Sequence, residues 1–145
     1  MKQRGCPLCE GAGGALVFDS PPFRVIRALE PGYPAFYRLV WSRHVAEFSD
    51  LAPAERHLCM DAVTQVEALV RKHLGPAKVN LASLGNVVPH LHWHVIARFE
   101  WDSHFPDAVW ATARRQAPAR ELARLEGLLP RLDAEIADTL ARPGH

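Results

Sequence analysis

The stretch His90-Leu91-His92-Trp93-His94-Val95-Ile96 alternates histidine with large apolar residues three times before it continues into aliphatic residues. Period two is typical of a β-strand, in which successive side chains point to opposite faces. We therefore expect the apolar positions to enter a core and the three histidines to share the other face. Neighbouring histidines on that face would lie roughly 6.6 Å apart, because a strand rises about 3.3 Å per residue.

This spacing lets adjacent histidines share one ligand, whereas His90 and His94 would lie roughly 13 Å apart, too far to bind one small ion together. A row of three imidazoles therefore suits an extended group, such as a phosphate chain, better than a single metal. The alternative is a half-exposed strand that carries polar histidines by chance. Because the chain has only 8 histidines in 145 residues, three at strict spacing favour the functional interpretation.

The motif resembles that of the histidine triad (HIT) superfamily of nucleotide hydrolases and transferases. Residues 80–89 are similar to the loop that precedes the triad in that family, and His44 matches the family's upstream histidine. Residues 105–110 resemble a segment that follows the triad in one bacterial branch. The resemblance extends over residues 6–110, and the chain is most similar to bacterial HIT proteins that resemble diadenosine tetraphosphate hydrolases.

Length and composition indicate one ordinary soluble domain. A formal charge of +1 offers no electrostatic case for nucleic acid or an anionic membrane as partner. No apolar run is long enough to span a bilayer, and the charged N-terminus is not followed by the apolar segment of a signal peptide. We therefore expect a cytoplasmic protein with reduced thiols.

The pattern of apolar, β-branched and aromatic residues predicts about five strands. Two of them form an antiparallel hairpin around the turn Pro31-Gly32, and the resemblance places the nucleoside pocket on this hairpin. Together with a central helix, the strands predict an α+β fold, in agreement with the HIT-like fold that the resemblance implies. The predicted strands are residues 15–18, 23–29, 35–41, 78–83 and 90–99.

The central helix is predicted over residues 53–74, because Pro53 suits the first helical position and Gly75-Pro76 ends the helix. Its apolar stripe could enter the core or form a dimer interface. The stripe consists of Cys59, Val63, Val66, Val70 and Leu74.

From Ala119 onward, leucines at helical spacing predict a C-terminal helical extension. We expect this extension, residues 111–145, to pack on the HIT domain of residues 1–110 rather than on a partner helix. Pro130 must either kink the helix or begin a second one.

Imidazole is largely uncharged at neutral pH, so it can attack phosphorus and leave again. In the family, the middle histidine of the triad attacks the α-phosphate and forms a nucleotidyl-histidine; this position is His92. The third, His94, donates to the phosphate and assists the leaving group, and His90 completes the catalytic triad.

Nucleotide binding is expected at Asn80, Gly85 and Asn86, together with His92 and His94. Asn80 could stabilise developing negative charge, and Gly85 permits close approach of the backbone to a phosphate. The sequence departs from the family at two positions. Val87 stands where many relatives have a serine or threonine, and Asn86 stands where glutamine is common.

Cys6 and Cys9 form a C-x-x-C pair that does not follow a strand and open a helix, which argues against a redox motif. Some family members bind zinc with such a pair, the upstream histidine and the first triad histidine. The resemblance thus implies zinc at Cys6, Cys9, His44 and His90, a closed tetrahedral site of structural type. The alternative is a pair of partly buried thiols near the terminus.

The leading hypothesis is a nucleotide hydrolase or nucleotidyl transferase that acts at the α-phosphate of a dinucleoside polyphosphate or a nucleoside phosphoramidate. Two alternatives are a nucleotide-binding module with little turnover and a zinc-binding protein without catalysis. The resemblance also implies a homodimer, because family members join two five-stranded sheets across a two-fold axis.

Overall fold

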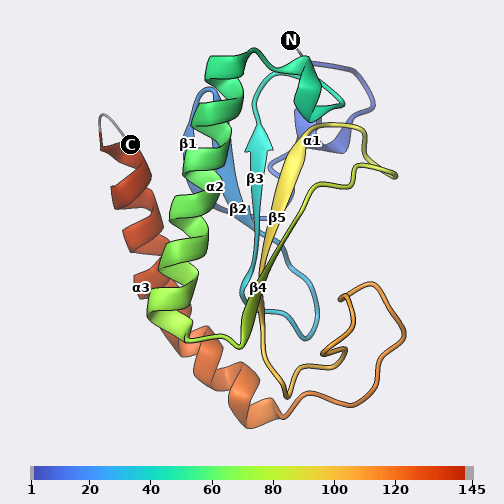
Figure 1. The fold of residues 1–145 in the computed structure, drawn as a ribbon, viewed down its shortest axis with the longest axis vertical. Helices are drawn as coiled ribbons and strands as arrows, with labels where there is room; N and C mark the ends of the chain where they lie inside the picture. Colours follow the sequence, from blue (N-terminus) through green and yellow to red (C-terminus); the bar gives the residue numbers. More distant parts are fainter. Residues whose placement is uncertain (1, 143–145) are drawn as a thin grey trace.

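An antiparallel five-stranded sheet in the order β1-β2-β3-β5-β4 is the frame of the protein (Figure 1). A computed structural model describes residues 2–142 of the chain. The predicted α+β fold with a central helix and a C-terminal helix is confirmed. The strands are β1 (Ala15–Ser20), β2 (Phe23–Arg27), β3 (Phe36–Trp41), β4 (Lys78–Ala82) and β5 (His92–Arg98), and the helices are α1 (Pro7–Glu10), the 3-10 turn η1 (Phe48–Asp50), α2 (Pro53–Leu74) and α3 (Ala119–Ala141).

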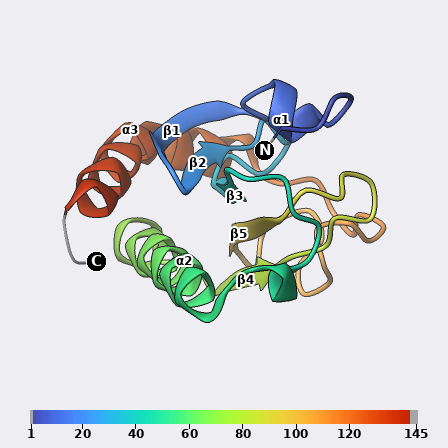
Figure 2. The same cartoon turned by 90° about the horizontal axis from the view of Figure 1, so that it is seen from above.

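The two long helices cover one side of the sheet. Figure 2 shows α2 and α3 together on that side, whereas α1 and the loop after β5 lie on the other side. Alternation along β5 follows this division: Trp93 and Val95 pack in the main core beneath the helices, and His92 and His94 face the other way. The sheet therefore separates a hydrophobic layer from a face that carries the polar groups.

Helix α2 begins and ends at the residues that the sequence predicts. Glu55 accepts a hydrogen bond from the backbone N–H of Ala52 at 2.8 Å, which satisfies the donor of the residue just before the helix. Gly75 ends the helix with φ +58°, in the left-handed conformation that favours glycine. The apolar stripe of α2 is buried in the core against the sheet, so its residues are not available as an exposed interface.

Helix α3 is one element that continues through Pro130 and does not restart there. Its buried apolar side chains lie in the same core as those of α2 and the sheet; they are Leu125, Leu129, Leu132, Ile136 and Leu140. Asp133 ties the helix to the sheet, because its carboxylate accepts hydrogen bonds from the Tyr37 hydroxyl at 2.6 Å and from Arg27 at 3.1 Å. The C-terminal helix is thus an integral part of the hydrophobic layer.

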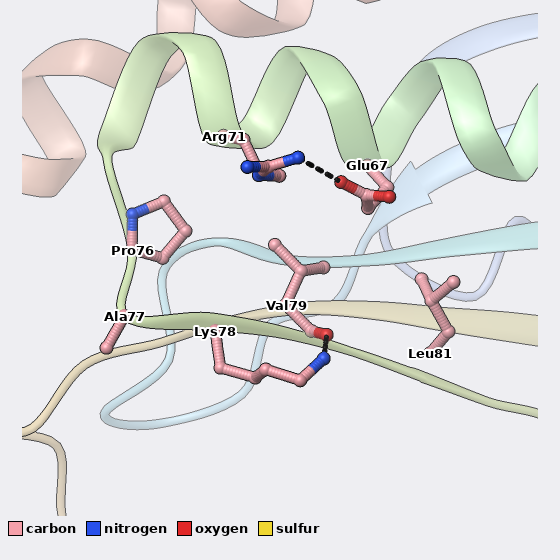
Figure 3. Close-up of a pocket in the computed structure, with 7 residues that line it drawn as sticks. All are labelled: Glu67, Arg71, Pro76, Ala77, Lys78, Val79 and Leu81. Carbon is pink, nitrogen blue, oxygen red and sulfur yellow. Dashed lines mark hydrogen bonds and ion pairs between the residues drawn. The ribbon is translucent and has the colours of Figure 1, made fainter.

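Strand β4 is an open edge of the sheet, paired only with β5. Beside it, on the helix side, lies a hollow of about 500 Å³ between β4 and α2. Figure 3 shows the Glu67–Arg71 ion pair on one side of this hollow and Leu81 at its border. The two charged groups of the pair are 3.9 Å apart. This edge hollow and the triad histidines are on opposite faces of the sheet.

Several strand boundaries differ from the prediction. Strand β1 extends to Ser20, β2 ends at Arg27 rather than at residue 29, and β5 begins at His92 rather than at residue 90; the other differences are of one residue. Before β5, the backbone bonds of Leu91 run to Trp41 and Val45 outside the ladder, so His90 is not part of the strand. Among residues 2–142, no helix is long and apolar enough to cross a membrane.

Candidate active site and metal centre

His92 and His94 lie side by side on β5, on the face away from the helices. Their rings meet edge to face with centroids 5.0 Å apart, and both side chains are largely buried. His90 does not continue this row, because the strand begins after it. Of the three imidazoles expected in one row, two therefore share one site, and the third lies at the site that the resemblance assigned to a metal.

The tautomer of His92 follows from one hydrogen bond. Its Nδ1 lies 2.6 Å from the backbone carbonyl of His90. A carbonyl oxygen can only accept, so Nδ1 carries the proton and donates it. The other ring nitrogen, Nε2, then keeps its lone pair, as a nucleophile requires.

Both histidines are held in the neutral form. Burial is the main cause that lowers the pKa of His92, and it lowers the pKa of His94 to about 4, with further contributions from His92 and Arg38. At neutral pH these imidazoles therefore carry lone pairs and no charge. Only the unprotonated ring can attack an electrophile such as phosphorus.

A hollow of about 520 Å³ opens in front of the two histidines. The loop before the triad forms one wall, where Gly85 has φ +77° and its backbone turns in a way that favours glycine. Trp110 forms another wall and meets His94 edge to face at 5.3 Å. The lining residues are Pro7, Leu8, Gly13, Arg38, Leu84, Gly85, Asn86, Val87, Val88, His92, His94 and Trp110.

Four of the five residues predicted to bind nucleotide line this hollow, and Asn80 does not. Asn80 lies on β4, where its side-chain oxygen accepts a hydrogen bond from Arg98 at 2.7 Å. Sequence reasoning missed Arg38 and Trp110. Arg38 could have been found as a charged residue within an otherwise apolar and aromatic strand, whereas nothing local marks Trp110 as a neighbour of His94.

The position of Trp110 depends on a buried ion pair at the start of its loop. Arg98 and Asp102 are each 2% exposed and meet at 2.9 Å. The Asp102 carboxylate also accepts hydrogen bonds from the backbone N–H groups of Phe99, His104 and Phe105. One carboxylate thus organises the turn that leads from β5 to the wall of the hollow.

A second cluster lies beside the active-site strand and contains Cys6, Cys9, His44 and His90. Their potential ligand atoms all lie within 4.8 Å of one another. Nδ1 of His90 is 3.5 Å from the Cys6 sulfur and 3.4 Å from the Cys9 sulfur. The structure thus brings together all four residues that the sequence predicts as metal ligands.

The ring of His90 is oriented for metal binding. Its Nε2 lies 2.6 Å from the carbonyl oxygen of Trp41, so Nε2 carries the proton and Nδ1 presents its lone pair to the two sulfurs. Burial also lowers the pKa of His90, which favours the neutral ligand form. The donor set fits a metal that accepts sulfur and nitrogen. Cys59 lies apart from it in the core, where burial raises its pKa to about 12.

Comparison with known proteins agrees with this geometry. A family model described as HIT domain matches residues 12–101. A histidine triad protein from Bradyrhizobium japonicum is 30% identical, with a TM-score of 0.67 over 83% of this chain and 90% of that one. One from Sinorhizobium meliloti is 26% identical, with a TM-score of 0.69 over 86% and 90%.

A third histidine triad protein, from Marinobacter aquaeolei, is 23% identical and has a TM-score of 0.73 over 97% of this chain and 99% of that one. At that identity the likeness concerns the fold alone. No curated protein sequence matches the chain significantly.

We predict that the Arg98–Asp102 pair makes stability sensitive to acid. Burial would raise the pKa of Asp102, but hydrogen bonds from Arg98 and backbone N–H groups outweigh it and lower the pKa from 3.8 to about 2. Because the folded-state pKa is the lower one, the carboxylate stabilises the fold fully above about pH 4 and loses this effect towards pH 2. Asp102→Asn should therefore lower the free energy of unfolding by about 2 kcal/mol at neutral pH.

Urea denaturation between about pH 7 and pH 2.5 measures this difference. It should shrink as the pH falls, since the wild-type carboxyl becomes protonated as well. Asp61→Asn, at an exposed position on α2, is the control and should change stability by less than about 0.5 kcal/mol. A difference between Asp102→Asn and wild type that stays constant with pH would contradict the prediction.

Proposed function

The chain belongs to the HIT domain family, and on that premise we propose that it hydrolyses or transfers a nucleotidyl group at the α-phosphate of a nucleoside phosphate derivative. The observation that carries the proposal is the state of His92. Its Nδ1–H is bound to the His90 carbonyl, and the neutral ring lines a hollow of about 520 Å³. A fixed tautomer beside an open site is what a histidine nucleophile needs.

The proposed reaction has two displacements at phosphorus. Nε2 of His92 forms a bond to the α-phosphorus while the bond to the leaving group breaks, and the leaving group departs with the bonding pair and is protonated. Water, or another acceptor, then attacks the phosphorus and gives up a proton. The nucleotide is released and neutral His92 is restored.

His94 supports this reaction as a hydrogen-bond donor. Its Nδ1 is buried and has no partner within the described residues 2–142, so the tautomer protonated on Nε2 avoids burying an unpaired N–H group. That N–H is then available to a phosphate oxygen in the hollow or to the leaving group. His90 does not contact the substrate in this proposal. Its backbone carbonyl sets the tautomer of His92, and its ring is a ligand in the metal cluster.

The proposed substrates are dinucleoside polyphosphates and nucleoside phosphoramidates, in which a good leaving group is attached to the α-phosphorus. A nucleotide-binding module with little turnover is the second candidate, and it is favoured by Val87. This side chain is 93% exposed at the hollow, where many relatives have a hydroxyl group that reaches the leaving group. The two candidates differ in turnover and not in binding.

We predict that His92→Ala abolishes release of AMP from diadenosine polyphosphates and adenosine phosphoramidate. Loss of a covalent nucleophile typically costs several orders of magnitude in rate. His94→Ala should reduce the rate less, because it removes a donor and not the attacking atom. Chromatography of the products measures both rates.

The matched control is His57→Ala, an exposed histidine on α2, which should keep the wild-type rate. Near wild-type release by His92→Ala would overturn the assignment of the nucleophile. A wild-type chain that binds AMP but releases none from any of these substrates would be the binding module.

We further propose that the metal cluster holds structural zinc. Two sulfurs and two imidazole nitrogens would hold the ion with four protein ligands, which is the donor set of a structural zinc site. The ion would join α1, which follows Cys6, to the segment after β3 that carries His44. Free thiols in the cluster suit a reducing compartment, and on this basis we propose a cytoplasmic location.

Purification without chelator should yield about one zinc per chain, as measured by atomic absorption. Cys6→Ser should lower both the zinc content and the melting temperature, because it removes a thiolate ligand. Cys59→Ser is the control: it disturbs the core at a buried cysteine and should lower stability without changing the zinc content. Metal-free wild-type protein would contradict the proposal.

The homodimer is also a proposal, and the open edge at β4 supports it. An unpaired edge strand presents free N–H and C=O groups that can pair with a second chain. Leu81 is 44% exposed beside the edge hollow, so an equivalent edge from a second copy could cover it. Two-fold closure is the commonest symmetry of such assemblies.

We predict a dimeric mass by light scattering at micromolar concentration. Leu81→Arg should shift the protein to a monomer, because it places a charge in the proposed interface. Leu16→Arg changes a 57% exposed leucine on β1, the opposite edge, and should leave the mass unchanged. A monomeric wild type would refute the dimer.

A further inference from the structure

Arg38 lines two hollows on the face of the sheet that carries the histidines. It lies on β3 directly opposite His94 in the β3–β5 ladder. It lines the hollow in front of the histidines and also a second hollow of about 300 Å³. The second hollow is lined by Gly13, Gly14, Ala28, Leu29, Glu30 and Arg38.

The guanidinium of Arg38 lacks hydrogen-bond acceptors among residues 2–142. Its Nε is buried and has no partner among residues 2–142. The guanidinium lies over the ring of Phe36, whose centroid is 5.5 Å from the guanidinium carbon. Buried N–H groups are normally paired, because an unpaired one has lost its hydration without compensation.

Other arginines on the same sheet are paired. Arg24 donates to the carbonyl oxygens of Leu8, Gly11 and Ala12, Arg27 donates to Asp133, and Arg98 donates to Asp102. The fold thus supplies acceptors for these three cations. The unpaired guanidinium is the one that points into the hollow of the histidines, which indicates an acceptor that comes with the ligand.

The charge of the site leads to the same conclusion. Among the described residues that line the hollow in front of the histidines, Arg38 has the only permanent charge. Burial and Arg38 itself keep His94 neutral by lowering its pKa. An anionic ligand would therefore find one cation there, and that cation is next to the histidine pair. A planar guanidinium can donate two parallel hydrogen bonds to a phosphate group.

We propose that Arg38 binds the non-bridging oxygens of the phosphate that His92 attacks, and so restricts the substrates to esters and amides with an anionic phosphorus centre. This inference rests on the proposed function and adds a substrate-binding residue to it. The same contact would stabilise the charge on the equatorial oxygens during displacement, since the donor is already in place before the reaction.

A purely structural role is the competing explanation. The Arg38–Phe36 contact could serve to hold the Phe36 ring, which meets His94 edge to face at 5.4 Å. In that case Arg38 would position His94 and would not touch the substrate. The two roles differ in one measurable respect: only direct binding depends on the phosphate of the ligand.

The test is calorimetric titration of the full chain with AMP and with adenosine, which differ only by the phosphate. Arg38→Met keeps an apolar stem of similar length and removes the charge. It should weaken AMP binding by about 10- to 100-fold, the range for a lost hydrogen bond to a charged group. Adenosine affinity should not change, and Arg38→Lys should bind AMP with intermediate affinity. Arg124→Met, on the exposed side of α3, is the control for net charge and should match wild type.

Three other results would each overturn the inference. If Arg38→Met and Arg38→Lys both bind AMP within about twofold of wild type, Arg38 does not contact the phosphate. If AMP and adenosine affinities fall equally, Arg38 acts only through the shape of the site. If the wild-type protein does not bind AMP, the proposed function itself is wrong. The wild-type titration alone shows this, so it is distinguished from a failure of the Arg38 inference.

Discussion

The rest of the structure depends on the register between β3 and β5. Because successive side chains of a strand point to opposite faces, the pairing of Leu39 with Trp93 and of Arg38 with His94 decides which residues enter the core. A slip of one residue would bury histidine under the helices and expose tryptophan on the polar face. The hydrophobic layer formed by α2 and α3 therefore fixes the chemical face as well.

Two backbone carbonyls set different tautomers in His90 and His92. The carbonyl of Trp41 engages Nε2 of His90, and the carbonyl of His90 engages Nδ1 of His92. Opposite ring nitrogens are thus left free in the two residues. The free nitrogen of His90 faces the thiols, whereas that of His92 is available to the hollow. The proposed metal ligand His90 and the proposed nucleophile His92 are thus only two residues apart, yet each presents its own lone pair to a different site.

Few charged groups lie near His92 and His94, so each of them has a large effect on how the hollow binds an anion. Burial lowers the pKa of both His92 and His94, so neither compensates an anion by protonation at neutral pH. The loop after β5 adds an aromatic wall through Trp110 and no permanent charge of its own to the lining. A phosphate in this hollow would be bound by neutral donors and by the guanidinium of Arg38, whose buried Nε has no partner among residues 2–142.

The sequence by itself determined what local patterns encode: the period-two histidine strand, the α2 limits at Pro53 and Gly75, and the convergence expected of the four metal ligands through family resemblance. Only the tertiary structure decided that β5 begins after His90, that Arg38 lies beside His94, and that α3 continues through Pro130 within the shared core. The physical reason is distance along the chain. Alternation, proline and glycine act on neighbouring residues, whereas register, burial and the pairing of polar groups depend on segments that meet only when the chain has folded.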